Sequence, residues 1–211
     1  MIRVVSIHGI AQEYRGPNTL KTDWITALQD GMTIAGADQL DQDDLGMVFY
    51  GELFRPAGSK AAAIPPYTAA DVADGFEKDL LEVLRLGVMD SSDPRATNKA
   101  RMPAGPQKAL YFLSQSPFFA GMTERLIVGL IKQVHAYLTD ASVRAEIQQR
   151  VARVITPETA VLIGHSLGSV IAYEAVCAHP EWDLSLVTLG SPLGIRNLVF
   201  ERLLPPPVNG A

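Results

Sequence analysis

The stretch VLIGHSLGSV, residues 161–170, decides the fold. Its first half completes an apolar run, residues 160–165, typical of a strand buried on both faces in a parallel sheet. Its second half opens a run of small and apolar residues, 168–178, that predicts a helix. Ser166 therefore falls where a strand passes into a helix, which is the context of the turn that presents a nucleophilic serine.

The residues around Ser166 suit that turn. Gly164 and Gly168 stand two positions before and after it, where they leave room for the close approach of strand and helix. A sharp, strained turn raises the serine side chain into a cleft. The amino end of the helix adds partial positive charge where an oxyanion would form. The alternative interpretation is a glycine-rich turn with an ordinary capping serine.

Strand and helix patterns alternate along the rest of the chain. Apolar, β-branched runs predict further buried strands at residues 2–7, 46–51 and 184–190. Apolar residues at helical spacing predict helices at 18–34 (with Asn18 as a candidate cap), at 71–88, and on either side of a break at Thr139-Asp140. Residues 57–67 and 90–106 lack periodicity and are predicted connections. This alternation predicts an α/β fold with a predominantly parallel sheet flanked by helices.

Composition narrows the class of protein. A chain of 211 residues fits a single domain, 1–211, and a net charge of -5 without a basic cluster argues against nucleic acid as a partner. Cys177 is the one cysteine, so a disulfide framework is excluded, and no metal or cofactor is implied. The sequence shows no signal-peptide pattern and no apolar run of ~18 residues, so we expect a cytoplasmic protein without a membrane span.

A second motif, HGIA at residues 8–11, follows the first predicted strand. Acyl transfer needs two backbone N–H donors aimed at the developing oxyanion. One belongs to the residue after the nucleophile, here Leu167, and the other comes from a loop after a neighbouring strand. Gly9 lets that loop turn tightly, and the amide of Ile10 is the natural donor. His8 either shapes the loop or takes part in the chemistry.

Three motifs together resemble the α/β-hydrolases of the lipase and esterase type: HGIA after the first strand, GHSLGS at the turn, and VTLGSPLG on the next strand. The resemblance covers the order of elements from residue 2 to about residue 194. It implies Ser166 as nucleophile and the amides of Ile10 and Leu167 as oxyanion hole. The residues that would support the loop and the turn are His8, Gly9, Gly164, His165 and Gly168. It also implies that residues 107–138 form a helical cap, although ordinary sheet-covering helices would show the same apolar stripe.

The base that would activate Ser166 is not evident. The family's chain order is serine, acid, then histidine, whereas His8 and His135 precede the serine. His165 is adjacent in a tight turn, and His179 lies about 16 Å away at the far end of the following helix. An unusual base, His8 or His135 brought in from another part of the fold, stays open because triads are defined by geometry.

The acid is also missing from its expected place. Asp183 precedes the last predicted strand, at the wrong end of the sheet, and no histidine follows Glu201. We therefore expect that the chain lacks the C-terminal part that carries the acid and the histidine in this family. The strand at 184–190 would then be an apolar edge, prone to self-association.

These observations predict a serine hydrolase that acts on small acyl substrates through an acyl-enzyme on Ser166. Carboxylic esters are the favoured class, with thioesters and amides as the other options. We expect weak or no activity from the 211-residue chain. The alternative is a catalytically dead domain of the same fold that binds a ligand or partner.

Overall fold

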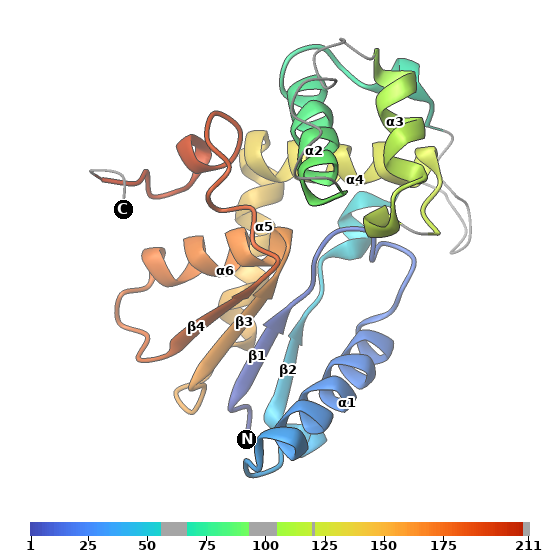
Figure 1. Ribbon diagram of the computed structural model, residues 1–211. Coiled ribbons are helices and arrows are strands. Elements are labelled where there is room, and N and C mark those ends of the chain that lie inside the picture. The colour runs from blue at the N-terminus through green and yellow to red at the C-terminus, as the bar shows by residue number, and fades with distance from the viewer. Residues whose placement is uncertain (56–66, 93–104, 120, 209–211) are drawn as a thin grey trace. The chain divides into compact units, whose positions relative to one another are not determined.

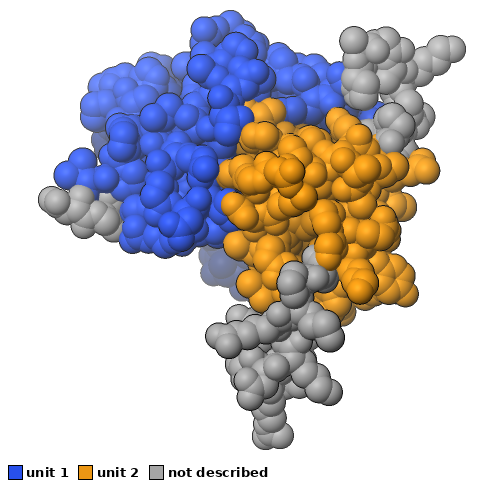
Figure 2. Space-filling model, turned by 90° about the horizontal axis from the view of Figure 1, so that it is seen from above, with its two compact units in different colours: residues 1–55, 137–211 blue, residues 56–136 orange. Residues whose placement is uncertain are grey.

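The computed structural model describes residues 1–55, 67–92, 105–119 and 121–208. Its contacts divide the chain into two compact units, coloured separately in Figure 2. The first unit comprises Met1–Arg55 and Tyr137–Ala211, and the second comprises Pro56–Ala136.

The first unit is built on a four-stranded sheet with the order β2-β1-β3-β4 (Figure 1). Every pairing in it is parallel. The strands are β1 (Val4–Ile7), β2 (Leu45–Val48), β3 (Val161–His165) and β4 (Ser185–Leu189). The α/β fold with a parallel sheet that the sequence predicts is therefore confirmed.

Helices cover both faces of this sheet (Figure 1). The helix α1 (Pro17–Ala35) packs on one face, where Ile25 lies among buried side chains of β1, β2 and β3. The helices α5 (Ala141–Val154) and α6 (Leu167–Ala178) pack on the other face. Gly46 permits this approach, because a Cβ there would lie 2.7 Å from Cγ1 of Val154.

The order of the strands creates a switch point between β1 and β3. The chain leaves β1 through α1 to reach β2 on one side, and it leaves β3 through α6 to reach β4 on the other side. In open parallel sheets, ligands bind outside the carboxyl ends of the two strands where the direction reverses. The residues that follow β1 and β3, HGIA and the Ser166 turn, stand at that place.

The last described residues of the first unit fold back onto its helices. Val199 and Leu203 are buried, and the N–H of Leu204 donates to a carboxylate oxygen of Glu174 at 2.9 Å. The same side chain accepts a hydrogen bond from the hydroxyl of Tyr137 at 2.6 Å. Burial raises the pKa of Glu174, and these two bonds together with the nearby Arg144 partly offset that effect.

The second unit is helical in its described residues. It contains α2 (Phe76–Ser92), α3 (Pro106–Ser114) and all but the end of α4 (Glu124–Thr139), with short 3₁₀ turns at Ala69–Asp71 and Pro117–Phe119. Glu77 of α2 is buried and accepts hydrogen bonds from Lys132 and His135 of α4. The segment predicted as a cap, 107–138, lies almost entirely in this unit, and its role as a cap stays a prediction.

Several predicted boundaries are wrong for identifiable reasons. The strand expected at 46–51 ends at Val48, because the N–H of Tyr50 bonds to His8 instead of a neighbouring strand. The first helix begins at Pro17, a favoured first position, and is not capped by Asn18. The helix expected from residue 71 begins at Phe76, because Gly75 has a φ of 77°. That helix extends through Ser92, into the connection predicted at 90–106. Most of the two predicted connections, residues 56–66 and 93–104, lies outside the described ranges.

The strand β4 is an exposed edge, as expected for residues 184–190, although its apolar sequence is typical of a buried strand. Among the described residues it pairs with β3 alone, and its side chains Val187 and Leu189 are 40% and 46% exposed. Both belong to the face on which α1 packs, but α1 contacts β2 at the opposite edge. Within the described ranges, no helix is both long and apolar enough to cross a membrane.

The edge leads to a prediction about self-association. A strand of sequence SLVTL has neither the charge nor the proline that usually protects an edge. We expect concentration-dependent association of the wild-type chain, and we expect Val187→Lys to reduce it. Sedimentation velocity across a concentration series measures the effect. The control is Ile34→Lys, at an equally apolar exposed position on α1. A wild-type chain that stays monomeric at high concentration would contradict the prediction.

Candidate functional site

Ser166 occupies a strained backbone conformation between β3 and α6. Its φ of 52° and ψ of -122° lie in a region that non-glycine residues rarely adopt. Hydrogen bonds on both sides hold it there: its N–H donates to the carbonyl of Leu189 and its carbonyl accepts from the N–H of Ser169, each at 2.9 Å. Such strain persists only where the surroundings enforce it, and it is concentrated at functional sites.

The side chain of Ser166 does not cap the helix that follows it. No cap hydrogen bond forms, although Ser166 is the residue at the cap position. Its hydroxyl has no hydrogen-bond partner anywhere in the part of the chain that the structure describes. The alternative of an ordinary capping serine is therefore excluded, since such a serine accepts from the first turn of its helix.

The two flanking glycines are required by backbone contacts. A Cβ at Gly164 would lie 2.4 Å from the carbonyl oxygen of Gly168. A Cβ at Gly168 would lie 2.4 Å from the carbonyl oxygen of Ile7, at the end of β1. Backbone atoms cannot swing aside as a flexible side chain can, so both positions exclude every other residue.

The HGIA loop lies against the serine turn. A Cβ at Gly9 would lie 3.0 Å from Cβ of Ser166 and 2.9 Å from Nδ1 of His165. The structure therefore brings together the two motifs that the sequence predicts to cooperate, although they are more than 150 residues apart. The loop also contains a second strained residue, Ala11, with a φ of 60°.

Two backbone amides at this place are available to an acceptor. Leu167 is the first residue of α6, so its N–H has no partner within the helix. The N–H of Ile10 also has no hydrogen-bond partner among the described residues. That the two donors converge on one oxyanion stays a prediction.

His8 is fully engaged and does not act as a base in this arrangement. Its ring is buried, with Nε2 3.1 Å from the backbone N of Tyr50 and Nδ1 2.6 Å from the carbonyl oxygen of Gly9. Because an amide can only donate and a carbonyl can only accept, Nδ1 carries the proton. Burial lowers the pKa of His8 to about 4, so the ring is neutral near pH 7 with its one lone pair occupied.

The other three histidines make no described hydrogen bond to Ser166. His165 is exposed beside the turn. His179 lies at the opposite end of α6, where it bonds to Glu181 at 2.8 Å and stacks on Trp182. His135 belongs to the second unit and bonds to Glu77 at 2.6 Å.

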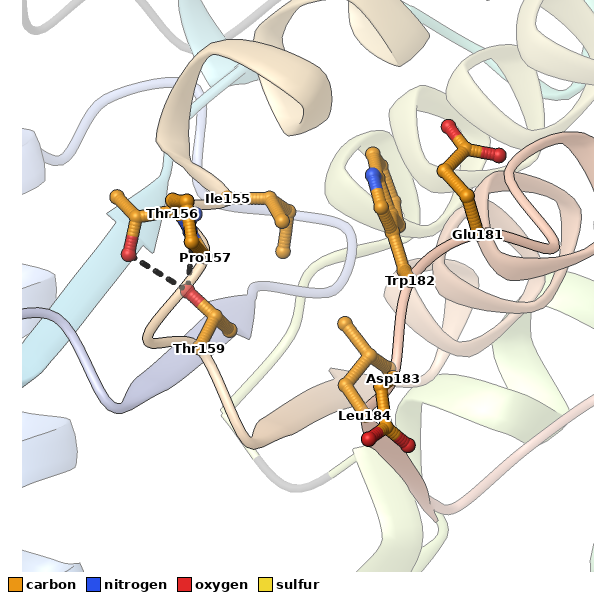
Figure 3. A pocket seen from close by; sticks show the side chains of 8 residues that line it. All are labelled: Ile155, Thr156, Pro157, Thr159, Glu181, Trp182, Asp183 and Leu184. Atoms are coloured by element: carbon orange, nitrogen blue, oxygen red, sulfur yellow. Dashed lines mark hydrogen bonds between the residues drawn. The ribbon is translucent and has the colours of Figure 1, made fainter.

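The two late carboxylates lie in other surroundings. Glu201 accepts a hydrogen bond from the N–H of Asn197 at 2.6 Å. Asp183 lines a pocket of about 420 Å³ before β3 and β4, at the end of the sheet opposite Ser166 (Figure 3). In that pocket the side chains of Ile155 and Trp182 form walls, and Thr159 bonds to Thr156.

A second pocket, of about 430 Å³, lies beside the serine turn. His165 and Leu189 line it from the sheet, and α1 contributes Trp24 and Leu28. The sequence does not point to this pocket or to Tyr50, because neither has a local signal. The pocket is lined by segments far apart in the chain, and Tyr50 meets His8 from 42 residues away.

Among the described residues, no group of three His, Cys, Asp or Glu side chains is arranged to hold a metal ion. Comparison of the chain with protein families, with curated proteins and with solved structures finds no match.

The glycine contacts predict a large loss of stability. We expect Gly168→Ala to lower the free energy of unfolding by about 2 kcal/mol or more, because the new methyl group meets the Ile7 carbonyl. Gly31→Ala is the matched control: this helical position has no atom within 4 Å of an added Cβ, so we expect a gain of up to ~1 kcal/mol. Urea denaturation measures both. Equal stabilities for the two variants would show that the turn is not close-packed.

His8 predicts a pH dependence of stability. Its pKa falls from 6.5 when unfolded to about 4 when folded, so the unfolded chain binds the proton more tightly. The contribution, about 3 kcal/mol, is fully present above pH 6.5 and is lost as the pH falls toward 4. We expect the free energy of unfolding of wild type to fall more steeply between pH 7 and 4.5 than that of His8→Asn. NMR titration of the ring provides a direct check, and a pKa near 6.5 would contradict it.

Proposed function

We propose that this protein is a serine acyl hydrolase of the α/β-hydrolase type, with carboxylic esters as its substrate class. One observation carries the proposal. The hydroxyl of Ser166, which has no hydrogen-bond partner in the described part of the chain, stands on a strained strand-to-helix turn, beside the loop that follows the neighbouring central strand. Structural serines at helix starts do not need this conformation, whereas a nucleophile needs an exposed side chain and nearby N–H donors.

The chemistry follows from the groups at the turn. The oxygen of Ser166 attacks the ester carbonyl carbon, and its proton passes to the alcohol that leaves. The carbonyl oxygen becomes an oxyanion, which the N–H groups of Ile10 and Leu167 and the amino end of α6 would stabilise. Water then attacks the acyl-enzyme, which releases the acid and restores the serine.

The step that needs a base is the transfer of the proton from the hydroxyl of Ser166. Among the described residues, no imidazole bonds to the hydroxyl of Ser166, and both ring nitrogens of His8 are occupied. An oxyanion hole and a positioned serine retain part of the catalysis of a complete triad. We therefore propose slow acylation of Ser166 and slow turnover by this chain.

The same observation supports a second candidate function, a binding domain that has the fold but does not catalyse. In that case a small acyl ligand or a partner would occupy the pocket beside the turn, between α1 and the ends of β3 and β4. The two functions differ in whether Ser166 reacts.

Covalent labelling distinguishes them. We expect a fluorophosphonate probe to modify the wild-type chain slowly at Ser166, as located by peptide mass spectrometry, and Ser166→Ala to remain unlabelled. Ser142→Ala, at an exposed hydroxyl near the start of α5, should label like wild type. Hydrolysis of p-nitrophenyl acetate should show the same pattern. A folded wild-type chain that is not labelled would favour the binding domain.

A further inference from the structure

The peptide group between Gly9 and Ile10 is held in one orientation by His8. The ring nitrogen Nδ1 donates to the carbonyl oxygen of Gly9 at 2.6 Å, in a buried environment. In a trans peptide the carbonyl and the following N–H point in opposite directions. The one cis peptide among the described residues is Leu204-Pro205, so the Gly9–Ile10 peptide is trans. Fixing the carbonyl of Gly9 toward His8 therefore turns the N–H of Ile10 away from His8.

The ring of His8 is itself fixed from three sides. Its Nε2 accepts from the N–H of Tyr50 at 3.1 Å, and the hydroxyl of Tyr50 donates to the carbonyl of His8 at 2.8 Å. The two rings stack with centroids 4.0 Å apart at 15°, and Phe49 packs at 5.3 Å. Because one nitrogen must accept and the other must donate, the ring can be neither flipped nor protonated without losing a bond.

A role in packing alone does not account for this arrangement. An apolar side chain would fill the buried space without the cost of removing an imidazole from water. Instead, both ring nitrogens of His8 bond to backbone groups: Nδ1 to the carbonyl of Gly9 in its own loop, and Nε2 to the N–H of Tyr50 just after β2. The charged and titratable neighbours that act on it are Glu52 and His165.

We propose that His8 is a positioning residue that sets the amide of Ile10 as an oxyanion donor. This inference rests on the proposed function, because an oxyanion donor matters only if Ser166 reacts. It assigns to His8 a role other than that of a base. The loop that carries the donor is thereby tied to β2 through Tyr50, and the register of β2 beside β1 decides where the donor lies.

Two substitutions separate the nitrogens of His8. The amide nitrogen of Asn occupies the place of Nδ1, so His8→Asn keeps a donor for the carbonyl of Gly9. The amide of Gln reaches the place of Nε2, so His8→Gln keeps an acceptor for Tyr50 but loses the bond to Gly9. We expect His8→Gln to slow fluorophosphonate labelling of Ser166 by about 100-fold, the effect of losing one oxyanion donor. We expect His8→Asn to restore most of the rate.

The control and a second measurement make the test decisive. His179→Gln, at the far end of α6, should label like wild type, and circular dichroism selects conditions in which every variant is folded. The NMR signal of the Ile10 amide should move in His8→Gln and stay near its wild-type position in His8→Asn. Equal labelling rates for the two His8 variants, with Ser166 still reactive, would overturn the positioning role and leave the proposed function intact. If wild type is not labelled, the proposed function fails, and an Ile10 amide that does not move would overturn the positioning role as well.

Discussion

The contact on which this structure depends is between two backbones. The carbonyl of Ile7, at the end of β1, lies so close to the start of α6 that a single methyl group on Gly168 would collide with it. On the other side of the same turn, Gly164 lies equally close to Gly168. These two approaches force the chain through the left-handed conformation at Ser166, because no room remains for a wider turn. The strain at the serine is thus a consequence of how tightly strand and helix pack.

The same approach brings two remote segments to one place. Once β1 and β3 are neighbours in a parallel sheet, the residues that follow them share an edge, and Gly9 meets Ser166 there. Both ring nitrogens of His8 are hydrogen-bonded, one to Gly9 in its own loop and one to Tyr50, and such a bonded network makes a site rigid. The hydroxyl of Ser166 has no hydrogen-bond partner among the described residues, and an unsatisfied reactive group within a fixed frame is what the proposed chemistry requires.

Buried titratable groups elsewhere in the first unit hold the frame and do not resemble a catalytic set. Glu174 receives the hydroxyl of Tyr137 and the N–H of Leu204, and so it anchors the last described segment to α6. Arg3 pairs with Asp44 at the beginning of β2, and it holds the pKa of that carboxyl well below its usual range. Neither pair lies at the carboxyl ends of the strands, where the serine turn is. The site is therefore defined by backbone geometry more than by a cluster of charges.

The sequence by itself determined the parallel α/β class, the strand and helix on either side of Ser166, and the importance of its glycines, because these follow from local patterns of apolar and small residues. It misplaced the end of β2 and the start of α2, where the hydrogen bond that the N–H of Tyr50 donates to His8 and the φ of Gly75 override the pattern. Only the tertiary structure decided which side chains of the β4 edge are exposed, since exposure depends on which strands and helices become neighbours. It also decided the protonation of His8, because burial and two backbone partners, Gly9 beside it and Tyr50 from a distant segment, fix which nitrogen carries the proton.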